Sequence, residues 1–146
     1  MSLVGAWWRQ ICQPLDGLLW KKGISHGVIR PLLRNQILLA GALILLGGII
    51  FIVWSWLFWA GCGFAVMTWI LYSWAAFFLR ADIGSYNAAF LRIVILRFGI
   101  RLLLLAVLLY IALRFFSAPA GAILVGLVTG TILGLVNFTY YMRKGA

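Results

Sequence analysis

A run of 45 residues without a charge, from Asn35 to Leu79, limits what this chain can fold into. As a single helix the run would be about 67 Å long at ~1.5 Å per residue, more than twice the ~30 Å hydrocarbon core of a bilayer. We therefore expect two membrane spans joined by a turn. A break at Gly47-Gly48 would leave the first span too short, so the turn is expected near Val53–Trp56, with Ser55 as a helix cap. This turn would place three tryptophans in an aromatic belt at the far interface: Trp54, Trp56 and Trp59.

Two further apolar stretches follow the polar segment Arg80–Asn87. The first contains Arg101 and Arg114 near its opposite ends, from which long side chains can reach the interface. The second begins at Pro119, a residue that suits the first turn of a helix. The sequence therefore predicts an all-α membrane protein with four transmembrane helices arranged as two hairpins. The expected spans are about 33–53, 57–79, 96–116 and 119–142.

The N-terminal segment has a different pattern. Its apolar residues Val4, Trp7, Trp8 and Ile11 recur at helical spacing, which is typical of a short amphipathic helix at a membrane surface. We expect this helix to be interrupted by Pro14, Asp16 and Gly17. The chain thus divides into a basic, amphipathic cytoplasmic segment (residues 1–30) and a transmembrane domain (residues 31–146).

Charge predicts the orientation. The chain has 12 Lys and Arg residues against 2 Asp and Glu, and 66% of its residues are hydrophobic. The basic residues flank apolar spans, so we expect contacts with anionic lipid headgroups and no nucleic-acid partner. In a four-span arrangement, Arg114 is the only basic residue on one side of the membrane. Eleven lie on the other: Arg9, Lys21, Lys22, Arg30, Arg34, Arg80, Arg92, Arg97, Arg101, Arg143 and Lys144. The positive-inside rule then predicts that both termini and the middle loop are cytoplasmic.

Small residues recur every fourth position in the last span, at Ala122, Gly126, Gly130 and Gly134. Such a face lets another helix backbone approach closely in lipid, where there is little hydrophobic drive for association. Two interpretations are open: packing against a helix of the same chain, or docking of another membrane protein. We assign the same helix-packing role to Gly61 and Gly63, and to Asn137 as a hydrogen-bond donor between helices.

The sequence offers little chemistry. Asp16 and Asp82 are the only carboxylates, and both fall outside the predicted membrane core. No acid–base pair, activated nucleophile, phosphate-binding loop or metal-ligand spacing is present, so we expect no catalytic residue, cofactor or metal. Arg97 and Arg101 share a helix face near the cytoplasmic boundary. They form a basic interface, either for lipid phosphates or for an anionic residue of a partner.

Several short motifs together resemble one family. They are Arg30-Pro31-Leu32-Leu33-Arg34-Asn35-Gln36, Gly61–Gly63, Arg97-Phe98-Gly99-Ile100-Arg101-Leu102-Leu103-Leu104, Ser117-Ala118-Pro119 through Leu124-Val125-Gly126-Leu127, and Asn137. In this order, over about residues 30–142, the chain is similar to the ATP synthase subunit I family, which is often encoded with bacterial F-type ATP synthases. That family often has an Asn midway along span two, where Thr68-Trp69 stands here. The resemblance implies a non-enzymatic protein that helps rotor subunit c insert and assemble into its ring.

Other functions stay open. A role in magnesium supply has been proposed for the same family, so one alternative is a small magnesium transporter or channel acting as a homo-oligomer. Magnesium prefers oxygen ligands and negative charge, and the spans contain almost none. Another alternative is a four-helix flippase for lipid-linked sugars that uses its arginines on phosphates. The narrow helix faces and the basic cytoplasmic side favour the assembly role.

Overall fold

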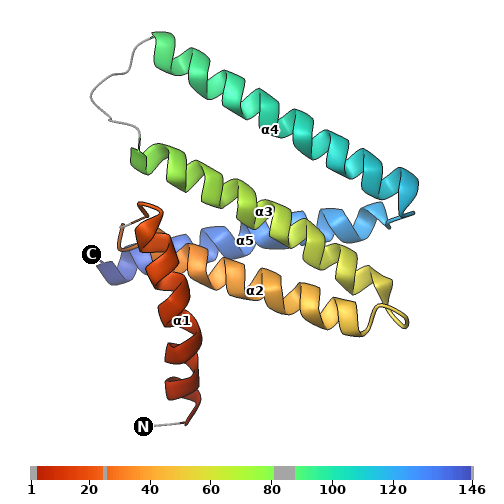
Figure 1. Ribbon diagram of the computed structural model, residues 1–146, viewed down its shortest axis with the longest axis horizontal. Coiled ribbons are helices and arrows are strands. Elements are labelled where there is room, and N and C mark those ends of the chain that lie inside the picture. Colours follow the sequence, from red (N-terminus) through yellow and green to blue (C-terminus); the bar gives the residue numbers. More distant parts are fainter. Residues whose placement is uncertain (1–2, 25, 81–87, 146) are drawn as a thin grey trace.

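The computed structural model describes residues 3–24, 26–80 and 88–145, and these residues form helices and short connections only (Figure 1). The helices are α1 (Leu3–Lys21), α2 (Ile29–Ile49), α3 (Ser55–Arg80), α4 (Ala88–Phe115) and α5 (Ala120–Gly145). The last four are long and apolar enough to cross a membrane. The predicted all-α membrane fold, with four spans behind an amphipathic N-terminal helix, is confirmed.

Within each hairpin, a short turn joins the two helices. α2 ends at Ile49 and α3 begins at Ser55, so the turn lies within a few residues of its predicted place. α4 begins at Ala88, earlier than the start expected near residue 96, because arginines oppose membrane insertion but are good helix formers. At ~1.5 Å per residue its 28 residues extend about 42 Å, which exceeds the thickness of the hydrocarbon core.

The expected interruption of α1 is wrong. The helix runs from Leu3 to Lys21 without a break and contains Pro14 in its interior. A proline removes one backbone hydrogen bond and crowds the carbonyl four residues before it, which can bend a helix without ending it. Cys12 and Leu19, on either side of the proline, are both buried, and their packing helps to keep the helix continuous.

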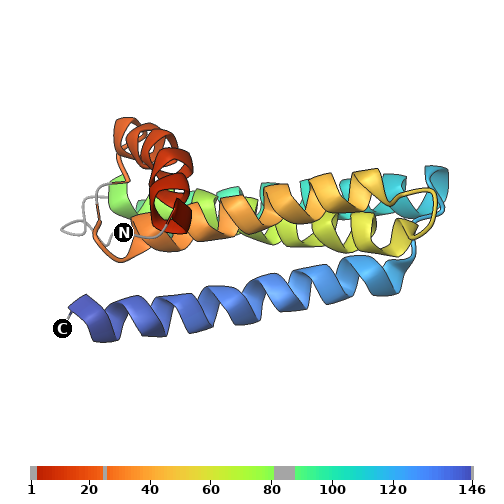
Figure 2. The same cartoon turned by 90° about the horizontal axis from the view of Figure 1, so that it is seen from below.

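The helices form layers (Figure 2). α2, α3 and α4 lie in one layer, α5 runs along one side of it, and α1 crosses the start of α2 on the other side. α3 packs extensively against both α2 and α5, so these three helices form the core. The largest fully buried side chains are those of Phe64, Leu33 and Gln36 in this trio and of Ile24 in the connection after α1.

The two ends of the bundle differ in charge. The α2–α3 and α4–α5 turns lie at one end, and α1, the start of α2 and the end of α5 lie at the other (Figure 1). Only Arg114 is in a last helical turn near the two short turns, whereas Arg143 and Lys144 are in the last turn of α5 at the opposite end. The asymmetry used to predict orientation is therefore present in the fold.

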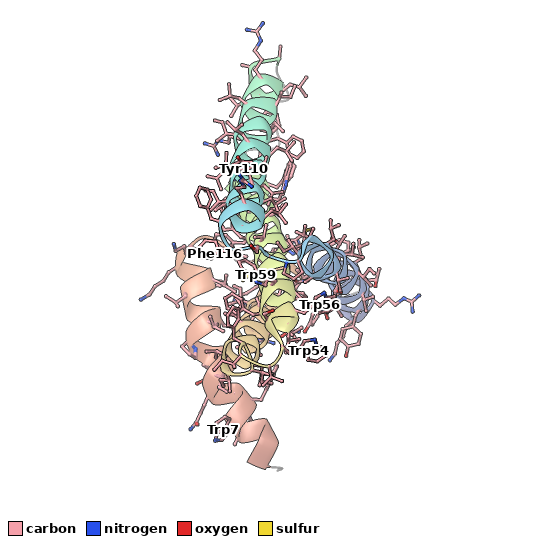
Figure 3. All side chains as sticks on the ribbon, turned by 90° about the vertical axis from the view of Figure 1, so that its right-hand side faces the viewer. Trp7, Trp54, Trp56, Trp59, Tyr110 and Phe116 are labelled. Carbon is pink, nitrogen blue, oxygen red and sulfur yellow. The ribbon has the colours of Figure 1, made fainter. Side chains whose placement is uncertain are left out.

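Aromatic side chains gather at the end with the short turns. Figure 3, which looks at that end, labels Trp54, Trp56, Trp59 and Phe116. The ring centroids of Trp59 and Phe116 are 6.0 Å apart, which links the start of α3 to the end of α4. Tryptophan rings suit a membrane–water interface because they are amphipathic.

Candidate functional site

The closest contact in the core is between α3 and α5, and two glycines make it possible. A Cβ atom built on Gly126 would overlap the carbonyl oxygen of Ala60 and lie 2.9 Å from the backbone nitrogen of Phe64. From the opposite side, a Cβ on Gly63 of α3 would overlap the carbonyl oxygen of Ile123 in α5. The two backbones touch here without intervening side chains, as small-residue interfaces in membranes allow.

Further along α5 the same face meets side chains. A Cβ on Gly130 would lie 3.0 Å from Cβ of Met67, and one on Gly134 would lie 3.1 Å from Nε2 of Gln36. Ala122, at the other end of the stripe, is fully buried. The small-residue face of α5 is thus occupied within the chain. Of the two interpretations open from the sequence, intramolecular packing is what the structure contains.

Glycines also set the approach of α2 to α3. A Cβ on Gly61 would lie 3.1 Å from the carbonyl carbon of Leu43. A Cβ on Gly47 would lie 2.6 Å from Cα of Phe58, so Gly47 is a packing residue that sequence reasoning missed. A Cβ on its neighbour Gly48 would meet nothing within 4 Å. The sequence shows a Gly-Gly pair, but only the packing reveals which glycine faces α3.

A buried polar junction links the three core helices. Gln36 of α2 is completely buried, and its Nε2 donates to the carbonyl oxygen of Gly130 in α5 at 3.1 Å. The hydroxyl of Thr68 in α3 lies 3.1 Å from Oε1 of Gln36 and 3.0 Å from its own helix carbonyl at Phe64. This role of Gln36 was not predicted from the sequence. One signal was available: Gln36 lies three residues after Leu33 and four before Ala40, on the same helix face.

The polar residues of α5 make fewer such contacts. Tyr141 accepts a hydrogen bond at its hydroxyl oxygen from Nδ2 of Asn35, at 2.9 Å, which ties the end of α5 to the start of α2. Thr131 donates to the carbonyl oxygen of Leu127 in its own helix. Asn137 is half-buried, and the described residues provide it with no hydrogen-bond partner.

An ion pair fastens α1 to the core. Nη1 of Arg34 donates to Oδ2 of Asp16 at 2.8 Å, and Nε of Arg30 lies 3.9 Å from Oδ1. The guanidinium of Arg30 also lies over the ring of Trp20, 5.4 Å from its centroid. Asp16 is therefore engaged with cations, and Asp82, the other carboxylate, lies outside the described residues.

α4 stands apart from the other spans. None of its 28 residues is buried, and most of its side chains are exposed (Figure 3). Rings link it to α3: the centroids of Phe90 and Phe77 are 5.8 Å apart, and those of Phe98 and Trp74 are 5.9 Å apart. α4 is thus the most open element of the transmembrane domain.

Arg97 and Arg101 lie on the side of α4 that faces α3. The guanidinium of Arg97 is 5.3 Å from the centroid of Phe77, within cation–π distance. Both arginines line a cavity of about 590 Å³ together with residues of α3. The structure therefore brings the two predicted interface arginines to one place.

Among the described residues no group of three or more His, Cys, Asp or Glu side chains is arranged to hold a metal ion. Neither family models nor curated proteins nor solved structures give a match to this chain.

Proposed function

We propose that this chain is a non-catalytic assembly factor of the bacterial inner membrane, which helps rotor subunit c of an F-type ATP synthase insert and form its ring. The observation that carries the proposal is the contrast between α4 and the other spans. α2, α3 and α5 use their small and polar residues on one another, whereas α4 has no buried residue. A span that its own protein leaves uncovered is available to another helix.

α4 also has a position at which a second backbone could approach. Gly99 is the one glycine of this helix, and a Cβ on it would meet nothing within 4 Å. A hairpin of narrow helices could lie against Gly99 without displacing any contact within the chain. The surrounding residues, including Leu96 and Leu103, are exposed and apolar, as contact with lipid or with a partner span requires.

The orientation belongs to the same proposal. We place α1, the start of α2 and the end of α5 in the cytoplasm, because the basic residues gather at that end. α1 runs across the bundle there and carries exposed Trp7 and Trp8, which suits a helix lying in the membrane interface (Figure 1).

Ion transport is less well supported. The buried polar groups Gln36 and Thr68 bond to each other and to backbone carbonyls, which leaves little to replace an ion's water shell. Asp16 is already paired with Arg34. The flippase alternative has one observation in its favour, the cavity lined by Arg97 and Arg101, and flux of labelled lipid in proteoliposomes would test it.

The assembly role is tested by co-expressing subunit c with this protein in cells whose chromosomal gene for this protein has been deleted. The yield of c-rings is then measured on native gels. We expect ring yield and recovered subunit c to fall severalfold with Gly99→Ile, although the isolated variant keeps its thermal stability. Gly48→Ile is the matched control, since its Cβ also meets open space but lies on α2. Unchanged ring yield without the protein, or with Gly99→Ile, would refute the assembly role through α4.

A further inference from the structure

The cavity between α3 and α4 has a basic wall and a polar wall. Arg97 and Arg101 line it from α4, Tyr72 and Ser73 line it from α3, and Lys22 extends into it from the connection after α1. Three separate parts of the chain thus converge on one space of about 590 Å³. Such basic pockets between spans bind lipid headgroups in other membrane proteins.

The two arginines lack an anionic partner within the described residues. Asp16 is the carboxylate there, and it is paired with Arg34. The face of Phe77 holds the guanidinium of Arg97 in place but does not neutralise its charge. A guanidinium offers five N–H donors in a planar fork, which phosphate oxygens satisfy well. The charge and donors of the cavity therefore fit a phosphate.

The depth of Arg101 makes an anion more important. Arg101 lies 13 residues after Ala88, about 20 Å along the helix axis, which is near the middle of α4. Its side chain is half-buried and lines the cavity. In the predicted span 96–116 Arg101 lies five residues from the cytoplasmic end, and an arginine at that depth is costly unless it reaches polar groups or a counter-charge. The cavity supplies that route, and a phosphate within it would supply the counter-charge.

The line along which α3 and α4 face each other, the α3–α4 seam, becomes apolar farther along α4. A second cavity, of about 180 Å³, lies between α3, α4 and α5 and is lined by Leu105, Leu108 and Ala112 of α4 and by Cys62 and Val66 of α3. Leu105 is one helical turn beyond Arg101. The α3–α4 seam thus has a basic, polar part followed by an apolar part, in the order in which a phospholipid presents its headgroup and its acyl chains.

We propose that the α3–α4 seam is a binding site for one anionic phospholipid. Its phosphate lies between Arg97 and Arg101, and an acyl chain follows the seam past Leu105 toward Ala112. The site goes beyond the proposed assembly role and does not depend on it. The bound lipid gives both arginines an anionic hydrogen-bond partner and fills the space that the ring contacts leave between α3 and α4.

Native mass spectrometry of the purified full-length protein tests the site, with defined mixtures of phosphatidylglycerol, cardiolipin and phosphatidylcholine added in neutral detergent. We expect one anionic lipid to be retained at least tenfold over phosphatidylcholine. Arg97→Gln combined with Arg101→Gln should abolish this preference. Arg92→Gln is the matched control, because it lies on the same helix but does not line the cavity. A second variant, Ala112→Phe, keeps both charges and should reduce retention by filling the apolar cavity.

Three outcomes would overturn the proposal. Equal retention of anionic and neutral lipid would exclude a phosphate site. An equal loss with Arg92→Gln would indicate diffuse attraction to the basic surface. Full competition by millimolar inorganic pyrophosphate, with retention unaffected by Ala112→Phe, would assign the cavity to a free phosphate and not to a lipid. Circular dichroism and size-exclusion profiles identical to wild type confirm that each variant is folded.

Discussion

Gln36 of α2 donates a hydrogen bond to the carbonyl oxygen of Gly130 in α5, 3.1 Å away, and both residues are buried. Thr68 of α3 lies on the other side of the same amide, 3.1 Å from Oε1. One side chain therefore fixes the register of three helices at the level of the glycine face. Because interhelical hydrogen bonds in membranes stabilise by only about 0.6 kcal/mol on average, the junction specifies position more than it adds stability.

This geometry predicts an asymmetric double-mutant cycle. Gln36→Leu removes two interhelical bonds and should lower the unfolding free energy by about 1 kcal/mol. Thr68→Val should cost less, because the single hydroxyl proton is shared between Gln36 and the Phe64 carbonyl, and the bond from Gln36 to Gly130 remains in this variant. Reversible unfolding in mixed micelles measures both, and the coupling energy should be near 0.6 kcal/mol. Strictly additive effects would mean that the two side chains do not interact. Gln13→Leu, on the exposed face of α1, is the control.

The ion pair of Asp16 with Arg34 predicts that α1 can be released. Asp16→Asn removes the charge that binds α1 to the start of α2, and pairs of this kind contribute up to about 1 kcal/mol. Since 1.4 kcal/mol is a factor of ten, maleimide labelling of buried Cys12 should rise about fivefold, measured with Cys62 replaced by Ser. Added salt should accelerate labelling of the wild type and have less effect on the variant. Labelling that is equally slow in both would show that apolar packing alone holds α1.

The orientation predicts which loops are accessible from which side. In a cysteine-free background, Val53→Cys lies in the α2–α3 turn and Lys144→Cys in the last turn of α5. A membrane-impermeant maleimide added to intact spheroplasts should label the first and not the second, and disruption of the membrane should expose both. The reverse pattern would invert the proposed topology.

Much of the fold follows from the sequence because length and charge decide it. The charge-free run from Asn35 to Leu79 is too long for one span, and its division into α2 and α3 needs no tertiary information. The continuity of α1 through Pro14 could not be predicted in the same way, since proline usually marks a break and only packing at Cys12 and Leu19 decides otherwise.

The site was partly predictable for a related reason. Four-residue spacing identified the small-residue face of α5, which includes Gly126. Spacing on one helix does not say which other helix covers that face. Gln36 was missed as a junction because the sequence shows a polar residue in an apolar run without showing the backbone carbonyl that it will meet. The cavity at Arg97 and Arg101 likewise depends on α3 side chains about 25 residues away in the sequence.

The glycine contacts predict a graded series of alanine substitutions. Gly126→Ala places a methyl group against the backbone of Ala60 and Phe64, which cannot move aside without shifting the α3–α5 crossing. Overpacking of this kind costs about 1–3 kcal/mol. Gly130→Ala meets the flexible side chain of Met67 at 3.0 Å and should cost less. Gly41→Ala in α2 meets nothing within 4 Å, and since alanine favours helix by about 0.5–1 kcal/mol it should be neutral or stabilising.

Thermal unfolding of the three purified variants in one detergent tests this order. The protein can be measured without a partner, because the contacts are internal to the chain. We expect the stability order Gly41→Ala at or above wild type, then Gly130→Ala, then Gly126→Ala. A destabilised Gly41→Ala would point to a general intolerance of larger residues in these helices. A Gly126→Ala protein as stable as wild type would mean that the α3 and α5 backbones are not in contact. The small-residue face would then be free for a partner, and the assignment of partner contact to α4 would have to be revised.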